Sequence, residues 1–294
     1  MTGRPQLGFV GIGLMGEAMT QRLLDRGYAV TVWNLEPERL DTVVQHGARA
    51  AASPAAVAEA SEIVLICVLH TAAVESCAFG SKGIAKVATP DKLLVDLSTA
   101  DPAATRDMVR RLKAETGMGW VDAPVSGGPP AARDGTMTVM AGGAAEDVAR
   151  IRPLMADMAA NFTHMGPSGA GQTAKMINQA IVGTGYVLMA EALVLAERAG
   201  IDAALLPECL AGGHADSNLL RKLYPQMQRR DFDPPRSYAR QLLKDLKAVK
   251  AFAHDLGLDL PVVEAAVERY AAYVEQGNEM ADSASVVRLY DPER

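Results

Sequence analysis

The chain has 294 residues, of which 49% are apolar and 22% charged, and its formal net charge is −6. This composition is typical of a folded globular protein of one or two domains and argues against a disordered or fibrous chain. The acidic balance provides no general basic field that would attract nucleic acid or an anionic membrane surface. We therefore expect neither a nucleic-acid partner nor a membrane partner.

Cysteine and histidine are too sparse to indicate a disulfide framework or a metal site. The 3 cysteines form no CxxC pair, and the 5 histidines include no HxxxH pair. The beginning, MTGRPQLGFVGIG, lacks the basic and then apolar plan of a signal peptide. The apolar run 181–196 contains Gly183, Gly185 and Glu191 and is too short for a bilayer span. We expect reduced thiols, no metal and a cytoplasmic location.

The first half alternates short β-rich apolar runs with helical patterns. The expected strands are 6–10, 29–33, 63–69 and 93–97, with sheet extensions at 120–123, 136–141 and 162–165. The expected helices are 16–26, 37–46, 54–60, 102–116 and 145–159, the fourth of these capped by Asp101 and ended by Gly117. This alternation predicts an α/β fold with a doubly wound, Rossmann-type parallel sheet.

After Gly171 the strand pattern stops and long helical periodicities follow. Breaks are expected near Gly200, Gly212, Pro234 and 257–261. We place a domain boundary near residue 166, where GPSGAG predicts a flexible joint. The prediction is a domain of alternating strands and helices at 1–165 and an all-helical domain at 166–294.

A glycine turn lies between the first strand and the first helix, with Gly11, Gly13 and Gly16 in GxGxxG spacing. Gly11 permits the tight turn, Gly13 lets the backbone approach a pyrophosphate, and Gly16 allows close helix–strand contact. The N–H groups of the helix start would face the anion. We predict dinucleotide binding here, with Leu14 and Met15 in the same turn. A plain tight turn and a methyltransferase-type cofactor site are the alternatives.

The choice between NAD and NADP depends on the end of the second strand, Asn34-Leu35-Glu36. An acidic residue there would hold the ribose 2′-hydroxyl, whereas an arginine would accept a 2′-phosphate. Asn34 is neutral, and Glu36 would repel a phosphate if it faced the site, although Arg39 is near enough in sequence to reach one. We predict NAD, with NADP as the alternative; a solvated helical turn is the other interpretation of Glu36 and Arg39.

Two further segments carry candidate chemistry. DAPVSGG, 122–128, ends a strand in a loop that is either an ordinary turn or an anion-binding loop for a substrate carboxylate. After the glycines of 166–171, Lys175 and Asn178 share one helix face among apolar neighbours. A lysine on a surface helix is usually solvated, but one that enters a dehydrated cleft can transfer protons. The spacing leaves both interpretations open.

Together, several signatures occur in order: GFVGIGLMG, DAPVSGG, GxxGxGxxxKxxxN at 166–178, and Lys244-Asp245-Leu246. The chain resembles the β-hydroxyacid dehydrogenase family over nearly its whole length. That family includes 3-hydroxyisobutyrate dehydrogenases, tartronate semialdehyde reductases and threonate dehydrogenases. The resemblance implies a Rossmann-type domain, an all-helical C-terminal domain, an active site in the cleft between them, and a homodimer or homotetramer.

The resemblance also implies roles for particular residues. Lys175 matches the catalytic acid/base, Asn178 a residue that orients substrate, and the loop residues Ser126, Gly127 and Gly128 the substrate-binding loop. Further family cofactor contacts fall on Leu69, His70, Thr99 and Lys244, besides the glycine turn and Asn34. One departure concerns the cofactor: NADP-preferring members often carry Asn-Arg-Thr where this chain has Asn34-Leu35-Glu36, which weakens the case for NADP.

The implied reaction is reversible hydride transfer between nicotinamide and a small 3-hydroxy acid such as 3-hydroxyisobutyrate, glycerate or a threonate-like acid. Because Lys175 must accept the hydroxyl proton during oxidation, we expect its pKa to lie below the lysine reference of about 10.4. An imine reductase-like NADPH enzyme and a non-catalytic dinucleotide-binding regulatory module are the alternatives. Relatives of both kinds usually lack this lysine. The sequence does not identify the hydroxy acid.

Overall fold

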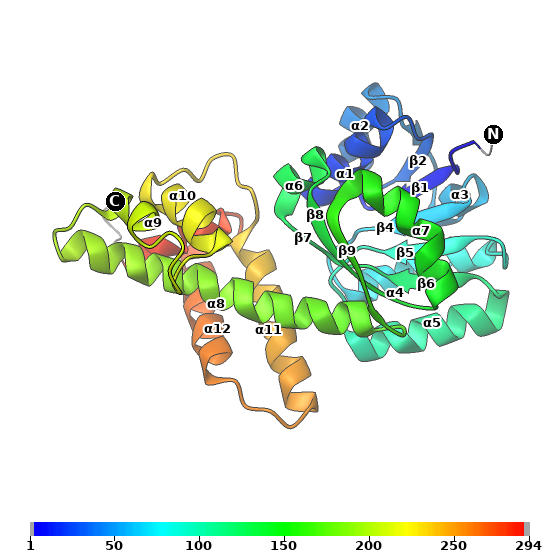
Figure 1. Ribbon diagram of the computed structural model, residues 1–294. Coiled ribbons are helices and arrows are strands. Elements are labelled where there is room, and N and C mark those ends of the chain that lie inside the picture. Colours follow the sequence, from blue (N-terminus) through cyan, green and yellow to red (C-terminus); the bar gives the residue numbers. More distant parts are fainter. Residues whose placement is uncertain (1–2, 291–294) are drawn as a thin grey trace. The chain divides into compact units, whose positions relative to one another are not determined.

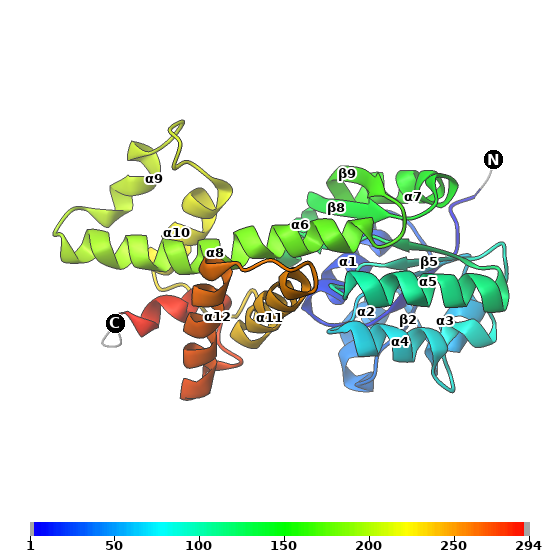
Figure 2. The same ribbon diagram turned by 90° about the horizontal axis from the view of Figure 1, so that it is seen from below.

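The computed structural model describes residues 3–290. The chain divides into two compact units, of which unit 1 ends at Lys175 and unit 2 begins at Met176. Figures 1 and 2 show unit 1 as a sheet with helices around it and unit 2 as an assembly of helices.

Unit 1 is built on a nine-stranded sheet in the order β3-β2-β1-β4-β5-β6-β8-β7, with β9 paired to β8. The strands are β1 (Leu7–Val10), β2 (Val30–Trp33), β3 (Arg49–Ala50), β4 (Ile63–Ile66), β5 (Leu93–Asp96), β6 (Gly119–Asp122), β7 (Val125–Ser126), β8 (Met137–Gly142) and β9 (Ala159–Gly166). The first six are parallel, whereas β8 is antiparallel to β6 and β7 and parallel to β9. The strand order reverses between β1 and β4, and such a switch point is where open α/β sheets bind ligands, at the carboxyl ends of the strands.

Helices cover both faces of this sheet. They are α1 (Leu14–Asp25), α2 (Asp41–Gln45), α3 (Pro54–Glu59), α4 (Thr71–Phe79), α5 (Pro102–Thr116), α6 (Gly128–Asp134) and α7 (Ala145–Met158). Phe9 and Leu65 pack into one apolar cluster with α1, α2, α6 and α7. Val10 and Ile66 point to the other face and pack with α3, α4 and α5. The strands are therefore apolar on both sides, as buried parallel strands require.

Unit 2 is helical. The long helix α8 (Ala170–Arg198) begins in unit 1 and continues into unit 2, and it is followed by α9 (Leu206–Cys209), α10 (Tyr224–Gln228), α11 (Ala239–Asp255) and α12 (Pro261–Tyr273). Short 3₁₀ and π turns join them at Ala203–Leu205, Leu219–Leu223, Val274–Asn278 and Ser283–Leu289. Tyr224, Tyr270 and Tyr273 are fully buried in the core of this unit. Residues 176–290 contain no strand.

Within the described residues, α8 is the one helix long and apolar enough to cross a membrane by length and composition. Its most apolar window has a mean hydropathy of 1.5 and is 44% buried. Val187, Ala190 and Leu193 pack into the core of unit 2. These contacts are those of a core helix in a folded domain.

The structure confirms the predicted α/β fold, and α5 has the predicted bounds because its signals are local. Asp101 accepts a hydrogen bond from the backbone of Ala104, and Gly117 ends the helix with a φ of +76°. The predicted helix 37–46 was wrong in type at its start: Pro37–Leu40 is a 3₁₀ turn, in which Arg39 N bonds Glu36 O, and α2 follows.

Other predicted boundaries were shifted. The strand expected to reach residue 69 ends at Ile66, because the backbone N–H of Val68 leaves the ladder and donates to the Ser98 hydroxyl. The last strand begins at Ala159 rather than at 162, because pairing with β8 extends it. The elements β3, α4, β7 and α6 were not predicted.

Candidate functional site

The glycine turn before α1 has two glycines that the fold requires and one that it does not. Gly11 has a φ of +99°, and a Cβ on it would lie 2.2 Å from the carbonyl oxygen of Cys67. A Cβ on Gly16 would lie 1.9 Å from the carbonyl oxygen of Gly11. A Cβ on Gly13 would meet nothing within 4 Å. Among the described residues, no side chain caps the start of α1. The turn therefore presents helix amides to open space, which fits a pyrophosphate.

Asn34 braces this turn from the end of β2. Its Oδ1 accepts a hydrogen bond of 2.8 Å from the backbone of Ile12, and its Nδ2 donates to Oε2 of Glu36 at 2.9 Å. Asn34 is buried, whereas Leu35 and Glu36 are exposed. The predicted cofactor residue Asn34 thus holds a carboxylate at the position where dinucleotide-binding sheets read the ribose.

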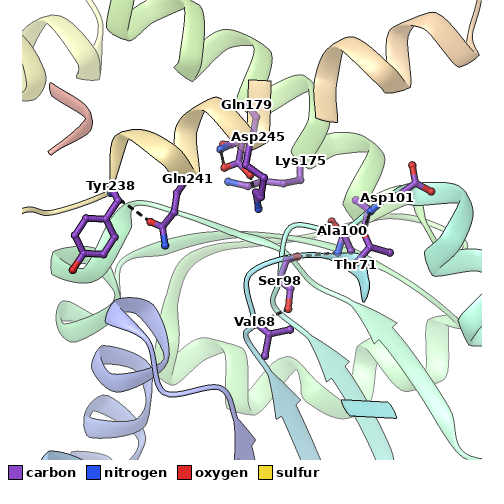
Figure 3. A network of polar contacts seen from close by, with 12 residues as sticks. Val68, Thr71, Ser98, Ala100, Asp101, Lys175, Gln179, Tyr238, Gln241 and Asp245 are labelled. Atoms are coloured by element: carbon purple, nitrogen blue, oxygen red, sulfur yellow. Dashed lines mark hydrogen bonds and ion pairs between the residues drawn. The ribbon is translucent and has the colours of Figure 1, made fainter. Parts of the chain in front are cut away.

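The other predicted cofactor contacts of unit 1 lie on the loops after β4 and β5. Ser98 Oγ accepts from the backbone of Val68 at 3.0 Å and so ties the two loops together, as Figure 3 shows. Thr99 follows this residue and is half-buried. Leu69 is exposed, and His70 Nδ1 accepts from the backbone of Ala73 to cap α4. Because β1, β4 and β5 are adjacent and parallel, these loops share the sheet edge that carries the glycine turn.

A second helix start, that of α8, is filled by a side chain of the protein. Asp122, at the end of β6, accepts hydrogen bonds from Gly169 N at 2.7 Å and from Gln172 N at 3.0 Å. A Cβ on Gly171 would lie 2.5 Å from the carbonyl oxygen of Asp122. The glycine segment that we expected to be a flexible joint is therefore fastened to the sheet.

Two buried carboxyl groups lie at this edge of the sheet. Asp96 and Asp122 are partners in register on β5 and β6, and both are 0% exposed. Burial raises the pKa of Asp96 to about 7. Burial also raises the pKa of Asp122, against backbone N–H groups that favour its anion. Within the described chain, Oδ2 of Asp96 has no hydrogen-bond partner. We infer that Asp96 holds a proton more readily and that Asp122 is the anion.

Lys175 lies beside the predicted substrate loop. Its Nζ donates to the carbonyl oxygen of Val125 at 2.9 Å, and the residue is only 6% exposed. Ser126 follows Val125 directly and is half-buried. Gly127 and Gly128 have φ values of +128° and +71°, a conformation that favours glycine. The structure thus brings the amine together with the DAPVSGG loop.

The predicted site residues of unit 2 belong to one polar chain. Asn178 Nδ2 donates to Oε1 of Gln179 at 2.8 Å, and Gln179 Nε2 donates to Oδ2 of Asp245 at 2.6 Å. Lys244 forms an ion pair of 2.8 Å with Oδ1 of Asp245. Figure 3 shows Gln179 of α8 and Asp245 of α11 side by side. Asn178 and Lys244 are thus linked within unit 2.

Sequence reasoning did not assign roles to Asp96, Asp122 and Gln172. A signal was present for the two carboxylates, because each ends a buried strand, LLVD or GWVD, with its one charged residue. Gln172 gave no such signal. The partners of its side chain lie more than 70 positions away in the sequence.

Comparison with known proteins agrees with this geometry. Residues 6–166 match the family model described as the NAD binding domain of 6-phosphogluconate dehydrogenase. Residues 169–290 match the model described as NAD-binding of NADP-dependent 3-hydroxyisobutyrate dehydrogenase.

Individual relatives match along almost the whole chain. 2-Hydroxy-3-oxopropionate reductase of Escherichia coli is 34% identical, covering 97% of each chain. 3-Hydroxyisobutyrate dehydrogenase of Pseudomonas aeruginosa is 33% identical, covering 97% of this chain and 98% of the relative. The crystal structure of 3-hydroxyisobutyrate dehydrogenase from Salmonella typhimurium superposes with a TM-score of 0.86 at 29% identity, covering 97% of this chain and 99% of that one. The chain therefore belongs to the β-hydroxyacid dehydrogenase family of NAD(P)-dependent oxidoreductases.

Proposed function

We propose that this protein interconverts a small 3-hydroxy acid and the corresponding oxo acid or semialdehyde, with Lys175 as the proton-transfer group. The observation that carries the proposal is the buried amine of Lys175, which lies 2.9 Å from the Val125 carbonyl oxygen, next to Ser126. A group that can donate or accept a proton therefore lies next to a candidate carboxylate-binding loop. A small hydroxy acid needs both groups close together.

The nicotinamide ring of the bound dinucleotide would accept or supply the hydride. Residues of the glycine turn (Gly11, Gly13, Leu14, Met15 and Gly16) would hold the pyrophosphate of the dinucleotide. Leu69, His70 and Thr99 lie on the neighbouring loops. In oxidation the neutral amine of Lys175 accepts the proton of the substrate hydroxyl, and in reduction its ammonium form returns it. The backbone N–H groups of Gly127 and Gly128 and the hydroxyl of Ser126 hold the carboxylate. The family resemblance assigns Asn178, on the same helix as Lys175, to orienting the substrate and Lys244 to contacting the cofactor.

The decisive test is Lys175→Ala. We expect turnover to fall by about 100-fold or more, the usual scale for the loss of an acid/base group, with the Kd for NADH almost unchanged. Lys113→Ala is the matched control, because Lys113 also donates to a backbone carbonyl at 2.9 Å but lies in an exposed setting. NADH absorbance with 3-hydroxyisobutyrate, glycerate, threonate and a cyclic imine gives the readout. Near-normal turnover of the variant, or turnover of the imine alone, contradicts the proposal.

We also propose that the enzyme prefers NAD to NADP. The hydrogen bonds from Asn34 hold the Glu36 carboxylate near the end of β2, where it would accept from the ribose 2′-hydroxyl and repel a 2′-phosphate. Glu36→Gln should shift the ratio of the Kd values for NADH and NADPH toward NADPH by about tenfold, or 1.4 kcal/mol. Glu38→Gln, two residues away and exposed, should leave the ratio unchanged. An unaltered ratio in Glu36→Gln would exclude this role.

We propose further that the functional domains are 1–165 and 166–294 and that the second joins copies of the chain into a homodimer or homotetramer. Four apolar side chains of α8 are 58–72% exposed and spaced along one face: Ile177, Ile181, Leu188 and Leu195. Leu188→Asp should reduce the mass measured by light scattering to that of a monomer. The control Leu35→Asp, at an exposed leucine of unit 1, should not. A monomeric wild type would contradict the proposal.

We propose a cytoplasmic location for the enzyme. Two of its cysteines, the buried Cys77 and the exposed Cys209, are free thiols, which suits a reducing compartment. Fractionation of cells that express the tagged protein tests this, and recovery in a membrane or extracellular fraction would contradict it.

A further inference from the structure

Gln172 lies in the first turn of α8 and is 0% exposed. Its Oε1 accepts from the backbone N–H of Ala100 at 3.0 Å, and its Nε2 donates to the backbone carbonyl of Ser98 at 2.9 Å. Both partners belong to the loop between β5 and α5. A single side-chain amide therefore satisfies a donor and an acceptor of that loop, as a strand partner would.

The loop to which the Gln172 side chain is hydrogen-bonded belongs to the candidate cofactor site. Ser98 N donates to Oδ1 of Asp96 at 2.9 Å, and Ser98 Oγ accepts from Val68 N at 3.0 Å. Figure 3 shows Val68, Ser98 and Ala100 on the neighbouring loops. The residue after Val68 is Leu69 and the residue after Ser98 is Thr99, both predicted cofactor contacts. The position of Gln172 is thus tied to the loops after both β4 and β5.

The backbone of Gln172 is fixed as well, because its N–H donates to Oδ2 of Asp122 at 3.0 Å. Lys175 follows three residues later, close to one helical turn, and its Nζ donates to the carbonyl oxygen of Val125, the first residue of β7. The first turn of α8 is therefore held from both sides, by the β5 loop through Gln172 and by the end of β6 through Asp122.

We propose that Gln172 is a positioning residue for the reaction. It fixes the orientation of α8 about its axis and the position of α8 along that axis, and thereby the position of Lys175 Nζ relative to the cofactor loops. The inference rests on the proposed role of Lys175. Its physical basis is that reacting groups tolerate little misplacement, and about 1 Å of error costs about 100-fold in rate. A residue with neither a donor nor an acceptor at position 172 would leave the backbone carbonyl of Ser98 and the backbone N–H of Ala100 unpaired, so the helix start would move to let water reach them.

Two variants separate positioning from packing. Gln172→Met keeps the length of the side chain but offers neither hydrogen bond. Gln172→Glu keeps the acceptor for Ala100 and regains the donor to Ser98 only when its carboxyl group is protonated. We expect Gln172→Met to lower kcat by about 30-fold or more, while the Kd for NADH changes less than about threefold. Turnover of Gln172→Glu relative to the wild type should rise as the pH is lowered.

The control and the second background complete the experiment. Gln226→Met removes another buried glutamine, whose Nε2 donates to the Asp231 carbonyl, and it should change kcat by less than about threefold. If Gln172 acts through Lys175, Gln172→Met should change the residual turnover of Lys175→Ala by less than about twofold.

The outcomes are distinguishable. Lys175→Ala with normal turnover would overturn the proposed function and, with it, this inference. A large loss in Lys175→Ala combined with near-normal turnover in Gln172→Met would overturn the inference alone. So would an equal loss from Gln172→Met in both backgrounds. Should Gln172→Met not fold, Gln172→Glu decides: relative turnover that does not change with pH would overturn the inference.

Discussion

The starts of α1 and α8 are both glycine-rich segments that follow strands of the same sheet. At α1, a Cβ on Gly13 would meet nothing within 4 Å, and the helix start has no side-chain cap within the described residues. At α8, a Cβ on Gly171 would collide with the backbone, and Asp122 supplies the anion. A glycine turn before a helix is therefore not by itself a ligand site. What differs is whether the protein has already placed a carboxylate there.

The largest expected effect concerns the crowded turn. In Gly171→Ala, the new Cβ would lie 2.4 Å from the Met140 carbonyl oxygen and 2.5 Å from that of Asp122, both backbone atoms. We expect the free energy of unfolding, measured with urea, to fall by about 3 kcal/mol, the upper range for overpacking. Helix propensity alone predicts the opposite, a gain of about 1 kcal/mol. A stabilised variant would therefore show that this turn is not crowded.

The next effect concerns the internal anion. In Asp122→Asn, one oxygen becomes an amide that cannot accept, which leaves Gly169 N or Gln172 N unpaired. We expect a loss of about 2 to 3 kcal/mol in the free energy of unfolding, the range for hydrogen bonds to charged groups. Asp101→Asn is the matched control, because asparagine caps a helix as well as aspartate does. Equal stability of the two variants would refute the assignment of Asp122 as the anion at α8.

A third prediction uses the neighbouring acid. Because the folded-state pKa of Asp96 is raised to about 7, its proton stabilises the fold fully at pH values below its unfolded pKa of about 4, and this contribution disappears as the pH rises through 7. Relative to Asp96→Asn, the wild type should therefore lose about 2 kcal/mol of unfolding free energy between about pH 5 and 7. Parallel urea titrations measure this. A difference independent of pH would place the proton elsewhere.

The smallest effect concerns the open turn. Gly13 has φ −89° and ψ −167°, which alanine adopts without strain. Gly13→Ala should therefore weaken NADH binding by about tenfold, or 1.4 kcal/mol, because the methyl group occupies space left for the pyrophosphate. Its free energy of unfolding should stay within about 0.5 kcal/mol of the wild type. In the control Gly3→Ala, the added Cβ also meets nothing, and NADH affinity should not change. If Gly13→Ala lowered the free energy of unfolding but not the affinity for NADH, the turn before α1 would be crowded rather than open to a ligand.

The sequence was informative where the determining contacts are local. Asp101 and Gly117 bound α5 at both ends, and the GxGxxG spacing located the turn before α1. The sequence was uninformative where distant segments decide. The short strand β7 exists because Val125 and Ser126 pair with Val139 and Thr138 of β8. The helix α6 begins Gly-Pro-Pro, which is typical of a loop, and proline is tolerated only because it stands in the first turn.

The candidate site divides in the same way. The glycine turn, Lys175 and the DAPVSGG loop were found from motifs, and the contact of Lys175 with that loop is a property of the fold. Gln172 was passed over because a glutamine in a helix is unremarkable until its burial and its two backbone partners are known. Single-chain reasoning therefore finds groups with their own chemical signature more readily than groups that hold them in place.

The brace formed by Asn34 has a consequence for cofactor engineering. The side-chain oxygen Oδ1 of Asn34 accepts from Ile12 in the glycine turn, and its Nδ2 donates to Glu36. Replacing Asn34 would therefore disturb the structure of the turn as well as the cofactor preference. The side chain of Leu35 is apolar and 75% exposed, so it makes neither of these hydrogen bonds. A designer who seeks to recode this enzyme for the phosphorylated coenzyme should therefore place the arginine at 35, neutralise 36, and retain the asparagine between them and the turn.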